Sequence, residues 1–140
     1  MSFKSHPVVD QMAALVGGHG DPCDFGCKEE DIDAMIARAT ELFPGKPCSV
    51  VANWCWGDIE IHPNDALKLR ETGVEPAFVF ADTVVYDQAN RWPKGSCVRT
   101  SFLVEFHHPC IFSTRNTSYI LLGPGTRMTV MPEVFIQLCY

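Results

Sequence analysis

Three residues near the start of the chain, His19, Cys23 and Cys27, follow one another at intervals of four positions. Imidazole nitrogen and thiolate sulfur are the usual ligands of a tetrahedral zinc ion. Structural zinc sites normally carry a second close pair of ligands, and this sequence has none. Buried thiols and a loop histidine are therefore the simpler interpretation, and no cofactor is predicted. The remaining candidates for a fourth ligand are Cys48, Cys55 and His62.

A second group of reactive side chains comprises His107, His108 and Cys110, with Arg99 in the same region. A cysteine becomes a nucleophile when a base lies within hydrogen-bond reach, so this group suggests a cysteine-histidine enzyme. Side chains of adjacent residues in an extended chain point in opposite directions, which favours a turn with one exposed histidine as the alternative.

Acidic residues crowd one short stretch, at Glu29, Glu30, Asp31 and Asp33. They precede a helical pattern, where one or two acids already satisfy the helix dipole. The excess predicts either a solvated helix start or a docking site for a basic partner protein. Trp92 is a further binding candidate. Tryptophans are most often core residues, and an exposed one would mark a contact surface.

The elements that must position these residues follow from periodicity. Helical spacing predicts one helix over Pro7–Val16, a second from Lys28 to Phe43, and a third after His62-Pro63. Pro47 to Ile61 predicts one long bent strand or a hairpin around Gly57.

The remaining strands are expected later in the chain. Pro76 to Tyr86 is apolar on both faces, which is typical of a covered central strand. Alternation from Val98 to Phe106 predicts a half-buried antiparallel strand, followed by strands at Cys110–Thr114 and Thr117–Leu122. Val134, Ile136 and Leu138 also alternate and predict a last strand. The fold class expected is α+β, with two or three short helices on an antiparallel sheet or partly open barrel.

Length and composition limit the possible functions. A chain of 140 residues with 46% hydrophobic and 20% charged residues is expected to form a single globular domain over residues 1–140. A net charge of −6 disfavours nucleic acid as a partner. No apolar run is long enough to predict a membrane span or an export signal, so a cytoplasmic protein is expected. Seven cysteines, an odd number, then predict free thiols.

The C-terminal half carries a distinctive pattern, with Arg91-Trp92-Pro93, Val98-Arg99-Thr100-Ser101, Thr114-Arg115-Asn116-Thr117 and Leu121-Leu122-Gly123-Pro124-Gly125. It resembles an uncharacterised family of small bacterial and prophage-associated proteins, a resemblance that implies no known activity. Ile120 to Val130 is also similar to a late strand-turn-strand of ADP-ribosyltransferases. That family's Glu-x-Glu pair has no counterpart between Ser113 and Ser118.

Two classes of function remain open from the sequence. The first is a small acidic protein that acts by binding another protein, as an immunity protein or a phage-borne inhibitor does. The second is a small enzyme or ligand-binding domain that uses the Cys/His/Arg region of the sheet. A deep pocket lined by Arg99, His107 or Cys110 would favour the second class, and a flat acidic face with exposed aromatic side chains would favour the first.

Overall fold

The longest strand of the sheet, β2 (Cys48–Ile59), is the axis of the molecule. In the computed structural model, which describes residues 6–138, β2 pairs along one side with the antiparallel strand β3 (Ala77–Asp87). Along its other side it pairs in parallel with β7 (Ser118–Leu122) and then with β8 (Gly125–Val130). β7 and β8 thus form one line beside β2, interrupted at Gly123-Pro124.

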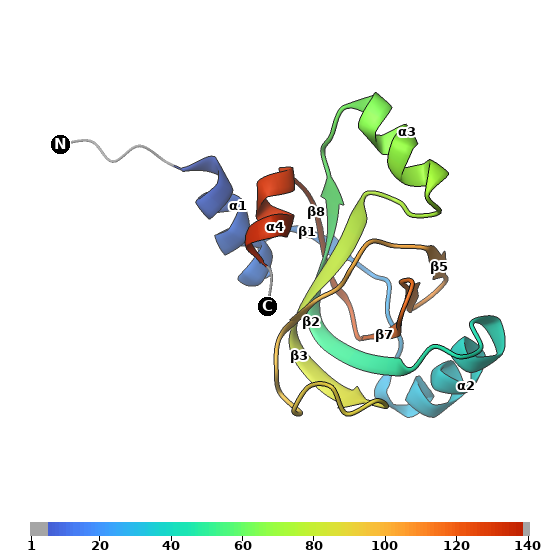
Figure 1. Cartoon of the computed structure of the whole chain (residues 1–140). Coiled ribbons are helices and arrows are strands. Elements are labelled where there is room, and N and C mark those ends of the chain that lie inside the picture. Colours follow the sequence, from blue (N-terminus) through green and yellow to red (C-terminus); the bar gives the residue numbers. More distant parts are fainter. Residues whose placement is uncertain (1–5, 139–140) are drawn as a thin grey trace.

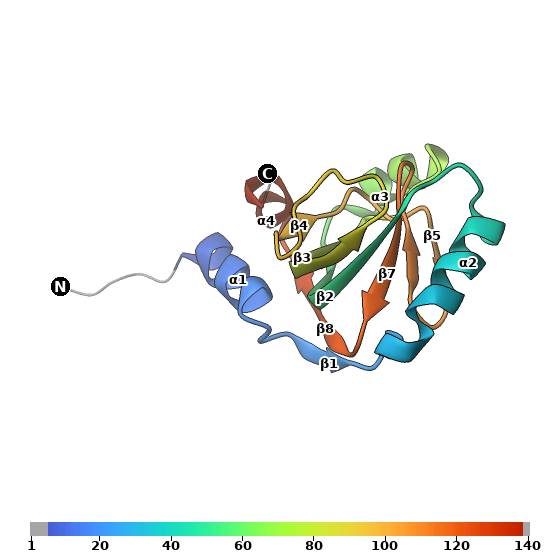
Figure 2. The same ribbon diagram turned by 90° about the horizontal axis from the view of Figure 1, so that it is seen from below.

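Shorter strands extend the sheet from this axis. β6 (Ile111–Ser113) and β5 (Glu105–His107) continue outward from β7, β1 (Asp21–Cys23) pairs with β8, and β4 (Val98–Arg99) pairs with β3. The eight strands of the described residues curl into a half-barrel, as the views in Figure 1 and Figure 2 show. The predicted α+β class with a partly open barrel is confirmed. The sheet is mixed, because β2 pairs in parallel with both β7 and β8.

Two helices cover the outer face of the sheet, α1 (Pro7–Val16) and α4 (Pro132–Gln137). Each begins with a proline, which suits the first turn of a helix because that position needs no backbone N–H donor. Their buried side chains meet the outward side chains of the strands. The buried members of this core are Val8, Leu15, Cys55, Phe78, Phe80, Val130, Val134 and Leu138.

The opposite face of the sheet carries the larger core, which α2 (Ile32–Leu42) covers after the short 3₁₀ helix η1 (Glu29–Asp31). α3 (Pro63–Glu71) stands apart from α2, at the far end of β2 (Figure 1). The helices predicted over Pro7–Val16 and after His62 are confirmed. The helix predicted from Lys28 to Phe43 is present as η1 followed by α2, so its α-helical part begins at Ile32. β2 is the single long strand that its apolar run allowed, and β3 is buried on both faces from Ala77 to Ala81.

The strand predicted at Val134, Ile136 and Leu138 is wrong, because these residues lie in and just after α4. Val134 and Leu138 are both buried while Ile136 is 65% exposed. Residues four apart share one face of a helix, so a helix buries the first and third members of this pattern and exposes the second. Three apolar residues at alternate positions fit both periods, and Pro132 was the signal that favoured a helix.

The single strand predicted from Val98 to Phe106 is also wrong, because this stretch holds the separate strands β4 and β5 with residues 100–104 between them. β4 ends at Arg99 because the Thr100 hydroxyl accepts the hydrogen bond of Val79 N at 2.9 Å, and a side chain thereby takes over a ladder position. The alternation then breaks. Phe102 is half-buried and stacks on Phe135, with ring centroids 4.7 Å apart, whereas Leu103 is the buried residue.

This altered register gives a first test. Leu103→Ala is expected to lower the free energy of unfolding by about 2 to 4 kcal/mol, because it leaves a cavity in the core. Phe102→Ala should cost less, since its ring is half-buried and already meets water. Urea denaturation of the two variants measures the difference, and an equal or greater loss at Phe102 would contradict the observed register.

The backbone of Gly26 and Cys27 passes close to Gly123, at the break between β7 and β8. The Gly26 N–H donates to Pro109 O at 2.8 Å, the Gly123 N–H donates to Cys27 O at 2.8 Å, and Trp54 Nε1 donates to Gly123 O at 3.1 Å. A Cβ atom placed on Gly26 would lie 1.9 Å from Gly123 O, so no other residue fits there without movement. This approach also brings Cys27 against the end of β7.

Six cysteines of the described residues are free thiols, as predicted, and Cys139 lies outside the described residues. Within residues 6–138 no helix has the length and apolar character needed to cross a membrane.

Candidate functional site

Cys110 was the candidate nucleophile, and the structure places it in the core with no exposed surface. Its thiol contacts the thiol of Cys27, and no hydrogen bond joins it to a histidine among the described residues. Burial raises the pKa of Cys110 to about 12, and the neighbouring Cys27 adds to this rise. A nucleophilic cysteine needs a lowered pKa, because the thiolate is the reactive form, so this environment suits an inert thiol.

The two histidines of the same group lie at the β5–β6 turn. His107 is the last residue of β5, and His108 is exposed, with its ring edge-on to Phe25 at a centroid distance of 5.8 Å. Arg99 lies elsewhere, at the outer face of the sheet. Its guanidinium carbon is 3.9 Å from the centroid of the Phe135 ring, and its Nη1 donates to Phe135 O at 2.8 Å. Arg99 therefore ties β4 to α4.

The candidate zinc ligands do not converge. Cys27 faces Cys110, Cys23 lies on β1 opposite Gly125, and His19 is exposed and packs near Gly17. Across residues 6–138, no three side chains of His, Cys, Asp or Glu are grouped so that they could hold a metal ion.

Trp92 is half-buried in the loop after β3. The guanidinium carbon of Arg91 lies 4.4 Å from the centroid of its ring, and the Tyr119 ring lies beyond it at 6.5 Å. Trp92 thus helps to hold this loop against β7.

The acidic stretch is entirely at the surface. Glu29, Glu30 and Asp31 form η1, Asp33 lies in the first turn of α2, and all four are exposed. None of their side chains caps the helices, and none belongs to the ion pairs found among the described residues. Six acids and one lysine lie between positions 21 and 33, so this segment carries −5 of the chain's net charge of −6.

An apolar groove of about 380 Å³ runs beside these acids, between α2 and the end of β3. Ile32 and Ile36 of α2 line it on the helix side. Val85 and Tyr86 of β3 line it on the strand side, together with Val50 of β2. Asp33 lines the groove as well, so its wall continues into the acidic stretch. Tyr86 is 49% exposed, unusually open for a large side chain on a strand.

The groove remains open because α2 makes only light contact with the sheet. Ala39 is the one residue of α2 that is fully buried. Larger apolar residues on the same side of the helix, Ile32, Met35 and Ile36, are only partly buried against the core. A helix that covered its face of the sheet completely would bury such a stripe. Apolar surface on both sides of the groove is therefore left partly exposed.

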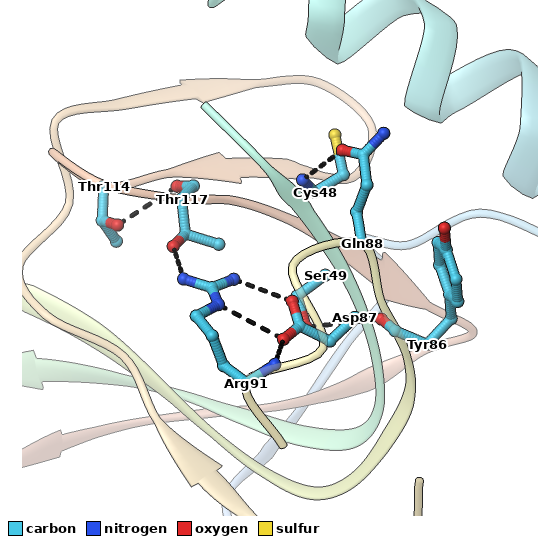
Figure 3. A network of polar contacts seen from close by, with 8 residues as sticks. All are labelled: Cys48, Ser49, Tyr86, Asp87, Gln88, Arg91, Thr114 and Thr117. Carbon is cyan, nitrogen blue, oxygen red and sulfur yellow. Dashed lines mark hydrogen bonds and ion pairs between the residues drawn. The ribbon is translucent and has the colours of Figure 1, made fainter. Parts of the chain in front are cut away.

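A polar network holds the end of β3 in place (Figure 3). Asp87 is buried, and both of its carboxylate oxygens accept hydrogen bonds from Arg91, with Nη2 to Oδ1 at 2.8 Å and Nε to Oδ2 at 3.2 Å. Arg91 Nη1 also donates to Thr117 Oγ1 at 2.6 Å, which links β3 to the turn before β7. Burial would raise the pKa of Asp87, but the hydrogen bonds and charge of Arg91 outweigh it and hold this pKa below its usual value.

Tyr86 is positioned by its two neighbours in this network. Its carbonyl accepts a hydrogen bond from Ser49 Oγ at 3.4 Å, and the next residue, Asp87, is anchored to Arg91. In Figure 3 the Tyr86 ring points away from the Asp87–Arg91 pair. These hydrogen bonds fix the backbone at Tyr86, which forms part of the strand side of the groove.

Residues 24–137 match the family model described as Domain of unknown function (DUF6957). The chain belongs to the DUF6957 family. No curated protein and no solved structure matches it. The residues that line the groove and the four acids of the α2 start all lie within the part that defines the DUF6957 domain.

The sequence indicated the acids but not the groove. Val85 and Tyr86 belong to the apolar run that was predicted to be covered on both faces. The one available signal was the tyrosine itself, because its hydroxyl needs a polar partner or water when it ends an apolar strand.

Proposed function

We propose that this DUF6957 domain binds another protein, and that a basic segment of the partner lies in the groove between α2 and β3. The observation that supports the proposal is the position of an open apolar groove directly beside the acidic stretch. Apolar side chains of a partner would supply affinity in the groove, and its lysines or arginines would face Glu29, Glu30 and Asp33.

The charge distribution supports a basic partner in particular. Outside residues 21–33, acids and bases nearly balance, so the excess negative charge lies in this segment, four of whose six acids are at the start of α2. A field of this kind increases the association rate of a partner with opposite charge. Such a domain would act as an immunity protein or a phage-borne inhibitor does, by occupying a basic surface of its partner.

The alternative, an enzyme or ligand-binding domain using the Cys/His/Arg region, receives less support. Each of five clefts on the described surface is lined by residues other than Arg99, His107 and Cys110. The raised pKa of Cys110 also disfavours the thiolate form of this residue.

Peptide selection tests the proposal even while the natural partner is unidentified. A phage-displayed library of random dodecamers is selected on the wild-type domain at low ionic strength. The enriched peptides are expected to combine Lys or Arg with a large apolar residue. Glu29→Lys with Glu30→Lys should then weaken binding of a selected peptide by about 5- to 30-fold, mainly through a slower association rate, and should flatten its salt dependence.

Two controls distinguish the groove from general charge. Asp65→Lys with Glu71→Lys on α3 makes the same change in net charge far from the groove and should leave binding nearly unchanged. Tyr86→Ala should weaken binding by about tenfold through the dissociation rate, because exposed aromatic side chains are common anchors. Equal effects of the two charge-reversal pairs, or selected peptides that lack basic residues, would contradict the proposal.

A further inference from the structure

A second cleft, of about 450 Å³, opens between α3 and the face of the sheet that carries the larger core. Its floor is apolar, formed by buried side chains of Trp56, Ala77 and Leu103. Two arginines from distant parts of the chain line the same cleft, Arg70 of α3 and Arg127 of β8. An apolar floor with a few convergent polar groups is the usual composition of a small-molecule site.

Arg127 is held in position by two neighbours. Its Nε and Nη2 donate to the two carboxylate oxygens of Asp58 at 2.7 Å and 3.1 Å, and its guanidinium carbon lies 4.6 Å from the centroid of the Trp56 ring. Trp56 Nε1 also donates to Asp58 Oδ1 at 3.1 Å, so Asp58 is fixed from both sides. The Nη1 group of Arg127 has no hydrogen-bond partner among the described residues, and the side chain is 43% exposed.

Arg70 lines the same cleft from α3, and a carboxylate holds it as well. Its Nε donates to Glu75 Oε2 at 2.8 Å, while both of its Nη groups lack partners among residues 6–138. Exposed ion pairs contribute little to folding. The carboxylates of Asp58 and Glu75 instead orient the two guanidinium groups. The N–H donors that these bonds leave unused belong to side chains that line a cleft with an apolar floor.

We propose that this cleft binds a small monovalent organic anion, a carboxylate attached to an aromatic or aliphatic body. A planar carboxylate matches the paired N–H donors of a guanidinium group, and its body would lie on Trp56 and Leu103. Asp58 and Glu75 already balance the two arginines, so the formal charge of the cleft is zero. This balance favours a monoanion over a phosphate dianion, because the two carboxylates would repel the second charge. The site is separate from the α2–β3 groove and does not depend on the function proposed for that groove.

Nuclear magnetic resonance titration with benzoate tests this site. In ¹⁵N-labelled protein the Trp56 indole N–H is the reporter, because it is bonded to Asp58 inside the cleft. Benzoate is expected to shift this signal saturably, and to bind at least about fivefold more tightly than benzamide, which has the same shape without the charge. Phenyl phosphate should bind more weakly than benzoate at a pH where it is a dianion.

Substitution of Arg70 completes the test. Arg70→Gln is expected to weaken benzoate binding by about tenfold, since a charge-assisted hydrogen bond is lost. Arg38→Gln on α2 removes an equally exposed arginine and should have no effect. The spectrum of each variant shows directly whether it is folded. Absence of a saturable shift at Trp56, equal affinity for benzoate and benzamide, or an unchanged affinity in Arg70→Gln would each overturn the proposal.

Discussion

Asp87→Ala is expected to lower the free energy of unfolding by about 2 to 4 kcal/mol at neutral pH. The substitution removes a buried carboxylate and leaves Arg91 without its ion-pair partner. The expected loss lies toward the lower end of the range for buried pairs, because the Arg91 side chain is 32% exposed and can be partly solvated. Urea denaturation measures the loss, and Asp82→Ala, at an exposed position on the same strand, serves as the control.

The same pair predicts a pH dependence. The pKa of Asp87 is below its usual value in the folded protein, so the unfolded chain binds a proton more readily. The stabilisation by Asp87 is therefore complete above about pH 4, the pKa of an unperturbed aspartate, and is lost as the pH falls through its lowered pKa. The stability difference between the wild type and Asp87→Asn should shrink on acidification. A difference that stays constant down to about pH 2 would contradict this assignment.

Gly26→Ala is expected to destabilise the fold by more than about 3 kcal/mol. Gly26 has a φ of +126°, where an L residue is strained, and its added methyl group would lie 1.9 Å from Gly123 O. Gly123 lies at the break between β7 and β8. To relieve the clash, the backbone at Gly26 and Cys27 would have to move away from both strands.

Gly45 separates the two causes of this loss. Its φ of +85° is also in the left-handed region, but an added Cβ would meet nothing within 4 Å. Gly45→Ala should therefore cost only about 1 kcal/mol, the strain of the backbone alone. Thermal unfolding of both variants provides the comparison. Similar melting temperatures for the two variants would mean that the backbone near Gly123 moves at little cost, and would contradict the prediction for Gly26→Ala.

Local patterns predicted the elements whose side chains have a clear period. α1 and α3 begin at Pro7 and Pro63 as expected, and the apolar stripe of α2 faces the sheet. The β5–β6–β7 hairpins also follow from turn residues. These features depend on neighbours along the chain, and a sequence displays such neighbours directly.

Features that depend on distant residues were not predictable. β4 ends at Arg99 because Thr100 bonds Val79, twenty-one positions earlier, and local alternation contains no trace of that contact. The parallel pairing of β2 with β7 and β8 is equally remote. For the candidate site, the acids of the α2 start were visible in the sequence. The groove beside them depends on how closely α2 packs against the sheet. The pattern of residue types along the chain does not show this distance.

The position of β2 between β3 and the β7–β8 line has a consequence for the order in which the chain can fold. β3 follows β2 closely and can form an antiparallel pair with it early, but the other side of β2 must wait for residues 118–130. Pairing across such a sequence separation carries a large loop-closure cost and slows folding. During synthesis, therefore, the apolar edge of β2 stays unpaired until most of the chain has left the ribosome. That edge is the segment through which a nascent or truncated chain would self-associate.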